Sequence, residues 1–266
     1  MRIVVCVKHV PDLSSDRVLG SDGRTVRTTE DGTLNEVDEN AVETALQVRE
    51  AAQAAGEADT EVIALTMGPE PAVDAVRRAL QMGADSGVHV CDDALAGADY
   101  AVTARTLAAA VRAQGHVDVL VTGMAALDGL GAVLPSLLAA ELGWPQLTVA
   151  REVQLTEGVL VATRDVDGAT ETWRAVPPAV VSVTDVANSP RLARMKQILA
   201  ARQKPVHTAT TADLGLTAAE LTARTEVRSA TRRPDPEPEI VFDDGTGGRQ
   251  LADYLIARDL LTKESR

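Results

Sequence analysis

The feature that most constrains the fold of this chain is the alternation of short β-branched runs with alanine-rich helical stretches between residues 3 and 183. The runs are continuously apolar, which is typical of strands covered on both faces of a parallel sheet. Asp38 is the expected N-cap of the first helix. The expected strands are residues 3–8, 61–67, 87–91, 117–122 and 179–183, and the expected helices are residues 42–55, 71–82, 100–114 and 131–142. The sequence therefore predicts an α/β fold with an open, mostly parallel sheet flanked by helices.

A different pattern interrupts this alternation after residue 151. Three short runs, residues 152–156, 159–164 and 170–174, are separated by the turn dipeptides Glu157-Gly158 and Asp167-Gly168. Short strands punctuated by such dipeptides are typical of hairpins. The sequence therefore predicts a small antiparallel insertion.

After Pro205 the alternation is lost. Residues 232–239 contain three prolines, which remove backbone donors and fix φ, so this stretch can form neither a helix nor a central strand. Residues 247–261 follow as an amphipathic helix, which cannot bury its apolar stripe by itself and must lie back on this domain or on a partner. We therefore expect a nucleotide-binding α/β domain over residues 1–205, and an extended linker with a C-terminal helical arm for partner contact over residues 206–266.

The charge balance limits the classes of partner. The chain has 39 acidic and 26 basic residues and a net charge of −13 at pH 7. Such a polyanion repels a phosphate backbone, which argues against nucleic-acid binding. No run approaches the ~18 uncharged apolar residues of a membrane span, and the N-terminus lacks the pattern of a secretory signal. We expect a soluble, cytoplasmic protein with no membrane insertion.

Aromatic and metal-binding side chains are scarce. The five aromatic rings are Trp144, Trp173, Tyr100, Tyr254 and Phe242. A base or a flavin must therefore be held largely by backbone, by aliphatic groups or by another chain. Cys6 and Cys91 lie in apolar runs, which favours buried free thiols. With no CxxC and no His pair at ligand spacing, we expect no bound metal.

The most informative candidate for chemistry is the loop after the fourth expected strand, residues 123–131, which leads into a helix. Glycine-rich backbone at a helix N-terminus presents free N–H donors and the positive end of the helix dipole, an arrangement suited to a phosphate. The loop is neither a Rossmann GxGxxG motif nor a P-loop. The alternative is that Gly129 and Gly131 only permit a tight connection, and the spacing alone favours neither interpretation.

Other polar residues give weaker signals. Lys8 fits the polar end of a strand better than a ligand contact. His9 has no carboxylate partner at readable spacing and fits a solvated or capping residue better than a general base. Cys6 fits the core better than a nucleophile. No triad, carboxylate pair or metal cluster can be assembled, which argues against a hydrolase or a metalloenzyme.

A basic helix is predicted to begin at Asn188-Ser189-Pro190. Its positive residues are Arg191, Arg194, Lys196, Arg202 and Lys204. Met195 lies among them, and an apolar tip surrounded by steering charge is typical of a small binding hot spot. The alternative is an ordinary solvated surface helix.

Nine segments, in order and at similar spacing, resemble the β subunit of electron transfer flavoproteins over roughly residues 1–205. They are IVVCVKHVPD, LNEVDENAVETAL, EVIALTMGP, ALQMGADSGVHV, DVLVTGMAALDGLGA, LGWPQLTVAREV, TRDVDGATETW, PPAVVSV and NSPRLARMKQILAARQKP. The Asp-Gly-Leu-Gly-Ala form of the loop is most similar to the actinobacterial branch of that family.

This resemblance implies an adenine-nucleotide α-hydrolase-like fold and a heterodimer with an electron transfer flavoprotein α subunit. The heterodimer would shuttle electrons from dehydrogenases, acyl-CoA dehydrogenases among them, to a quinone reductase. The redox FAD would lie mainly on the α subunit, and this chain would bury a structural AMP and perform no bond chemistry of its own.

The resemblance also carries over functional residues by matching position. The nucleotide would contact Cys6, Asn35, Glu36, Val37, Asp38, Met67, Gly123, Asp128, Gly129, Leu130, Gly131, Ala132, Val133 and Leu134. Client dehydrogenases would dock on Met195, with Arg191, Arg194 and Lys196 beside it. Asp165 stands where the family usually has a Glu that steadies the mobile flavin domain.

Ala132, Val133 and Leu134 depart from the family, because many members have a polar Asn/Gln-Gln-Thr/Val stretch there. Backbone N–H groups must then make most phosphate contacts, and Pro135 offers none. Three alternatives follow. One is a bifurcating β subunit with a second FAD, whose loop would be closer to Asp-Gly-Asp-Thr-Ala-Gln. The others are a stand-alone ATP-binding stress-type protein, whose long glycine-spaced signature is missing here, and a structural interaction subunit with an empty site.

Overall fold

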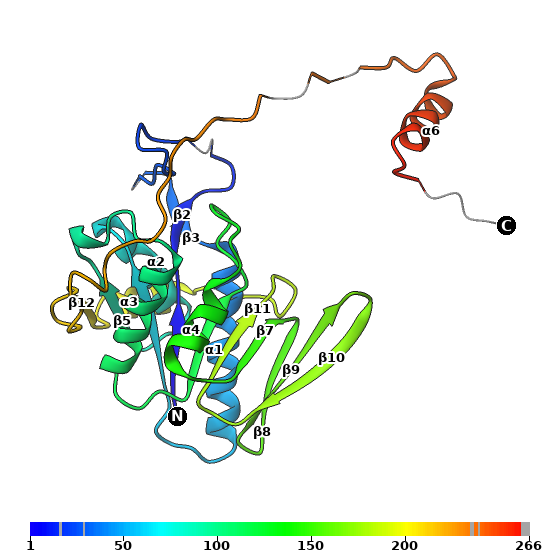
Figure 1. Cartoon of the computed structure of the whole chain (residues 1–266). Coiled ribbons are helices and arrows are strands. Elements are labelled where there is room, and N and C mark those ends of the chain that lie inside the picture. The colour runs from blue at the N-terminus through cyan, green and yellow to red at the C-terminus, as the bar shows by residue number, and fades with distance from the viewer. Residues whose placement is uncertain (16–17, 29, 235–236, 239, 262–266) are drawn as a thin grey trace. The chain divides into compact units, whose positions relative to one another are not determined.

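The central sheet consists of seven parallel strands in the order β12-β5-β4-β1-β6-β11-β7 (Figure 1). This computed structural model describes residues 1–15, 18–28, 30–234, 237–238 and 240–261. The strands are β1 (Arg2–Cys6), β4 (Glu61–Met67), β5 (Ser86–Val90), β6 (Val119–Gly123), β7 (Gln146–Ala150), β11 (Ala179–Val183) and β12 (Val206–Ala209). The predicted α/β fold with a parallel sheet is confirmed.

Helices cover both faces of this sheet. They are α1 (Glu36–Ala54), α2 (Val73–Met82), α3 (Tyr100–Ala113) and α4 (Leu134–Leu142), with short 3-10 turns η1 (Glu70–Ala72) and η2 (Asp93–Leu95). A hydrophobic core lies on each face of the sheet, and alternate residues of β1 point into one or the other. Ile3 and Val5 pack with α1 and α2, whereas Val4 and Cys6 pack with α3 and α4. Each fully buried Val, Leu or Ile contributes about 1.5–3 kcal/mol, so a continuously apolar strand stabilises both layers.

The direction of chain winding changes beside β1. β4 and β5 lie on one side of β1, and β6, β11 and β7 lie on the other. The carboxyl ends of β1 and β6 therefore border the point where open α/β sheets bind ligands. Two short strands, β2 (His9–Pro11) and β3 (Gly32–Leu34), pair antiparallel beyond the end of β1 (Figure 1). The sequence did not predict this pair.

The predicted antiparallel insertion is present as a three-stranded sheet. Its strands are β8 (Glu152–Thr156), β9 (Val159–Val166) and β10 (Ala169–Ala175), in the order β10-β9-β8. Both turn dipeptides have positive φ at each residue, as tight hairpins with right-handed twist require. Leu160 and Ala162 of β9 are buried in the core that contains α1, and β8 lies against α1 (Figure 1).

Three predicted helix starts were wrong. Helix α1 begins at Glu36 with Asn35 as N-cap, so Asp38 is inside its first turn. Helix α4 begins at Leu134 instead of Gly131, because the intervening loop adopts left-handed conformations. Helix α5 (Met195–Ala201) begins at Met195 and not at residues 188–190, because Asn188 and Arg191 contact α1 through their side chains.

The sheet also extends past the domain boundary drawn from the sequence. β12 pairs with β5 at the sheet edge, and the compact unit that contains the sheet is Met1–Ser229. The second unit, Ala230–Arg266, contains α6 (Gly247–Ala257), which has no buried residue. The proline-rich stretch 232–239 lies partly outside the described residues, as do residues 262–266 of the arm. Among the described helices, none has the length and apolar character needed to cross a bilayer.

Candidate functional site

The loop between β6 and α4 lies at the carboxyl end of β6, next to the change in winding direction. Two non-glycine residues in it, Leu130 and Ala132, have φ of 49° and 52°, and Val133 returns to the right-handed region with φ −100° and ψ −17°. Left-handed backbone costs an L-residue roughly 1–2 kcal/mol. Successive residues of opposite hand point their N–H groups toward one centre and form an anion-binding nest. At Ala132 and Val133 the loop therefore has the change of backbone hand from which such a nest can be built.

The N–H groups of this loop divide into two sets. Those of Gly129 and Leu130 donate to the Ala126 carbonyl, at 3.2 and 2.7 Å. Within the described part of the chain, the N–H groups of residues 131–134 have no acceptor. They belong to the loop end and the first turn of α4, where the helix dipole adds partial positive charge. Four donors are thus available to an anionic ligand.

The side chain of Asn35 fixes this loop through two hydrogen bonds to its backbone. Its Nδ2 donates to the Ala125 carbonyl at 3.1 Å, and its Oδ1 accepts the Leu127 N–H at 3.0 Å. Its own backbone N–H donates to the Lys8 carbonyl at 2.9 Å. Because Asn35 is fully buried, it links α1, β1 and the loop beneath the surface on which a ligand would lie.

Asp38 and Gly123 bring α1 against the end of β6. The Oδ2 atom of Asp38 accepts the Lys8 N–H at 2.8 Å. A Cβ atom on Gly123 would lie 2.4 Å from Asp38 Oδ1 and 3.2 Å from the Val37 carbonyl, so only glycine permits this approach. Burial raises the pKa of Asp38 to about 7, against the opposing hydrogen bonds from Asn35 and the Lys8 backbone. The carboxyl group therefore titrates near neutrality.

Cys6 takes no part in nucleophilic chemistry. Burial, together with the negative charge of Asp38, raises the pKa of its thiol to about 12. Only the thiolate is a nucleophile, so this thiol is inert at neutral pH. It packs with Val4 and Leu65 in the core on the α3 and α4 side.

Asp128 forms an ion-pair cluster at the rim of the site. Its Oδ1 lies 2.8 Å from Lys8 Nζ, and its Oδ2 accepts Arg27 Nε at 2.9 Å. Burial of the carboxylate raises its pKa, but the charges and hydrogen bonds of Lys8 and Arg27 outweigh burial and hold the pKa below its usual value. Both cations are partly exposed while the Asp128 side chain is not. The cluster therefore presents one net positive charge to solvent.

Arg27 was missed by sequence reasoning, because it lies 101 residues from Asp128 and in no recognisable motif. Tyr100 was missed too: a Cβ atom on Gly131 would lie 1.7 Å from its hydroxyl. The structure gathers Cys6, Asn35–Asp38 and the loop around the carboxyl ends of β1 and β6. Met67 ends the neighbouring strand β4 and packs with the α3 and α4 core.

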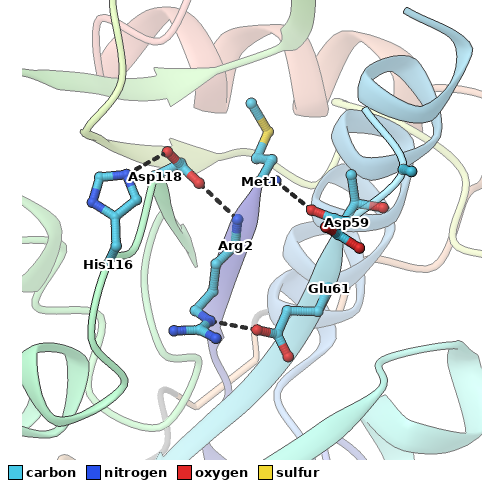
Figure 2. A pocket seen from close by; sticks show the side chains of 8 residues that line it. Met1, Arg2, Asp59, Glu61, His116 and Asp118 are labelled. Atoms are coloured by element: carbon cyan, nitrogen blue, oxygen red, sulfur yellow. Dashed lines mark hydrogen bonds and ion pairs between the residues drawn. The ribbon is translucent and has the colours of Figure 1, made fainter. Parts of the chain in front are cut away.

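A hollow at the opposite edge of the sheet does not fit a ligand site. Figure 2 shows its side chains at the amino end of β1. The Arg2 N–H donates to Asp118 Oδ2 at 2.7 Å, and the Met1 amine donates to the Asp59 carbonyl at 2.6 Å. Arg2 and Glu61 form an ion pair, and His116 lies 3.0 Å from Asp118 Oδ1 (Figure 2). These polar groups already satisfy one another.

Of the predicted docking residues, Met195, Arg194 and Lys196 are exposed, whereas Arg191 is paired with α1. Leu192 and Leu199, which the sequence analysis did not name, are exposed on the same segment. Leu192, Met195 and Leu199 are 84%, 70% and 53% exposed and form what we call the docking strip. Arg194 and Lys196 are exposed beside it. Arg191 instead forms ion pairs with Glu43 and Glu50 of α1. Asp165 of β9 pairs with Arg151 at 2.9 Å and accepts the Thr170 hydroxyl at 2.6 Å.

Comparison with known proteins agrees with this architecture. The family profile described as "Electron transfer flavoprotein domain" matches residues 23–214. The chain is 39% identical over 264 residues to the electron transfer flavoprotein subunit beta of Mycobacterium bovis, and equally to that of Mycobacterium leprae, covering 97% of this chain and 99% of each relative. It is 32% identical over 216 residues to the caffeyl-CoA reductase-Etf complex subunit CarD of Acetobacterium woodii, covering 81% and 80%. The chain therefore belongs to the electron transfer flavoprotein family, as a β subunit.

Proposed function

We propose that this β subunit holds one AMP at the loop between β6 and α4 and performs no bond chemistry of its own. The observation that carries the proposal is the set of four available N–H donors at residues 131–134. The net positive cluster of Lys8, Asp128 and Arg27 adds a favourable field for a phosphate at the same rim. The electron-carrying FAD is assigned mainly to the α subunit, which accords with the few aromatic rings of this chain.

The residues present fit a nucleotide phosphate through backbone rather than side chains. Ala132, Val133 and Leu134 contribute no polar side-chain atoms, but each supplies an N–H group. Asn35 and Asp38 would act from below, by fixing the loop and the end of β1. AMP would then tie the loop to the sheet and rigidify the face on which the flavin domain lies.

We also propose that the docking strip binds client dehydrogenases in the cytoplasm, acyl-CoA dehydrogenases among them, before electrons pass to a quinone reductase. Its apolar side chains are flanked by the exposed cations Arg194, Lys196 and Arg202. An acidic-rimmed apolar hollow on the client is the complementary surface. A similar chain, CarD of Acetobacterium woodii, is named as a subunit of a caffeyl-CoA reductase-Etf complex, which supports this proposal.

The test is a nucleotide count on the purified heterodimer with its α subunit. Denaturation followed by chromatography should release about one AMP and one FAD per heterodimer. Two FAD without AMP would replace this proposal by that of a second-flavin subunit. If the heterodimer releases neither AMP nor a second FAD, that result contradicts the nucleotide proposal. The docking proposal would remain intact.

A further inference from the structure

We propose that Arg191 is a positioning residue that clamps the docking segment to α1, and that it does not itself contact the client enzyme. This inference rests on the proposed docking role of the strip formed by Leu192, Met195 and Leu199. It reassigns Arg191 from the docking set that the sequence predicted.

The clamp begins with a bidentate ion pair. Arg191 Nε and Nη2 donate to the two carboxylate oxygens of Glu43, at 2.7 and 2.9 Å, and the Arg191 backbone N–H donates to Glu43 Oε2 at 3.2 Å. The Glu43 side chain is 5% exposed, and its second oxygen also accepts Gln47 Nε2 at 3.0 Å. Burial disfavours the Glu43 carboxylate, but the Arg191 hydrogen bonds and charge hold its pKa below the usual value. A guanidinium engaged at this many atoms has little left to offer a partner.

A reciprocal amide pair extends the clamp. Asn188 Nδ2 donates to the Asn40 carbonyl at 3.0 Å and to the Thr44 hydroxyl at 2.9 Å. In return, Asn40 Nδ2 donates to the carbonyl groups of Asp185 and Asn188, at 3.1 and 2.9 Å. Buried side chains of α1 therefore hold residues 185–191 in place. These residues immediately precede the docking strip.

The other end of the segment is anchored on α2. Ala201, at the end of α5, is buried in the core that contains α1 and α2. Lys204 Nζ donates to the carbonyl groups of Leu80, at 3.1 Å, and Ala84. The strip is thus the exposed middle of a segment fixed at both ends. A partner meets an ordered surface and does not have to order it on binding, which is the physical basis of preorganisation.

The experiment uses the flavin-loaded heterodimer and its acyl-CoA dehydrogenase in steady state, with the heterodimer as the varied substrate. Glu43→Gln should raise the KM for the heterodimer about tenfold, with kcat and the AMP and FAD content unchanged. Amide exchange over residues 186–199 should become faster. The control is Glu50→Gln, which removes an ion pair of Arg191 that is more exposed than the pair with Glu43. This variant should change KM by less than about twofold.

A double-mutant cycle separates positioning from direct contact. If Arg191 acts only through Glu43, then Arg191→Gln should add nothing to KM in the Glu43→Gln background. Additive effects would mean that Arg191 contacts the client and would overturn the inference, as would an unchanged KM for Glu43→Gln. Failure of the docking proposal itself is distinguishable, because Met195→Glu would then leave transfer unchanged as well.

Discussion

Among single residues, the buried polar side chains Asn35 and Asp38 determine the shape of the candidate site. Both act through backbone groups: Asn35 on Ala125 and Leu127, and Asp38 on Lys8. Matching by position predicted that these residues matter, but their contacts place them beneath the loop. Sequence could not show this, because each contact joins residues 30 to 92 positions apart.

Removing the Asn35 amide should loosen the loop. Asn35→Ala leaves the part-buried Ala125 carbonyl and Leu127 N–H without their amide partner. A fully buried group left unsatisfied costs about 1–3 kcal/mol, and we expect a smaller cost for each of these two. We expect a lower melting temperature and loss of bound AMP, measured by thermal unfolding and by chromatography of the released nucleotide. A variant that retains stoichiometric AMP would contradict the anchoring role.

The titration of Asp38 should make the free energy of unfolding depend on pH. Its pKa is about 7 in the folded chain and 3.8 as a free side chain, so between these values the folded state holds a proton that the unfolded state has lost. The free energy of unfolding should therefore fall as pH rises from about 4 to 7, by on the order of 4 kcal/mol, and then level off.

The measurement is denaturant unfolding between pH 4.5 and 8 for wild type and Asp38→Asn. Burial lowers the pKa of His9 from its ordinary value of 6.5, which adds a slope of opposite sign below that value in both proteins. The difference between the two proteins isolates Asp38 and should favour the Asn variant increasingly with pH. A difference that does not vary with pH would refute the assignment.

At the level of elements, the loop between β6 and α4 depends on the free space around its glycines. A Cβ atom on Gly131 would collide with the Tyr100 hydroxyl, whereas one on Gly129 would meet nothing within 4 Å. The Gly129 N–H is already paired with Ala126, so Gly129 lies outside the available donor set. The two glycines therefore offer a matched pair of substitutions.

Gly131→Ala drives the added methyl group into the Tyr100 side chain, which is 48% exposed, so that this side chain or the loop must move. We expect this displacement to weaken AMP binding about tenfold, because misplaced N–H groups lose charge-assisted hydrogen bonds. Gly129→Ala should keep its AMP. Adding Tyr100→Ala to Gly131→Ala removes the collision and should restore binding. Isothermal titration of the nucleotide-stripped heterodimer with AMP measures all three, and equal affinities for the two alanine variants would contradict the donor assignment.

Docking should depend on the apolar strip. Met195→Glu places a carboxylate at the 70% exposed tip of the strip, and we expect kcat/KM with the client dehydrogenase to fall at least about tenfold. The FAD and AMP content should be unchanged, because Met195 makes no core contact. Transfer at the wild-type rate with every client tested would refute the docking role.

Elements were predictable where a pattern was long and apolar. β4, β8 and β11 have the bounds that the sequence indicated, because each is a continuous apolar or cleanly punctuated run. β7 and β12 were missed because they are short edge strands with exposed polar positions, which resemble loops. The start of α5 was missed because side-chain contacts with α1, and no local signal, keep residues 188–191 out of the helix.

For the whole molecule, the C-terminal unit is the feature that most needs a partner. Helix α6 presents Leu251, Tyr254 and Ile256 with 59%, 40% and 44% of their surface exposed, and none of its residues is buried. An isolated amphipathic helix of this length is marginal in water. We therefore propose that the arm packs on the α subunit.

Truncation after Ser229 removes this unit and leaves the unit that contains the sheet. We expect the shortened chain to remain folded but to lose stable association with the α subunit, measured by size-exclusion chromatography of the co-expressed chains and by circular dichroism. Undiminished heterodimer would show that the arm does not hold the subunits together.

The central claim is that backbone N–H groups of residues 131–134 bind the phosphate of an adenine nucleotide. A crystal structure of the purified heterodimer tests it most directly. We predict an AMP phosphate whose oxygens lie about 2.7–3.2 Å from these nitrogens, with Lys8 and Arg27 nearby. A crevice closed by the chain's own side chains, or a nucleotide phosphate bound elsewhere, would contradict the account.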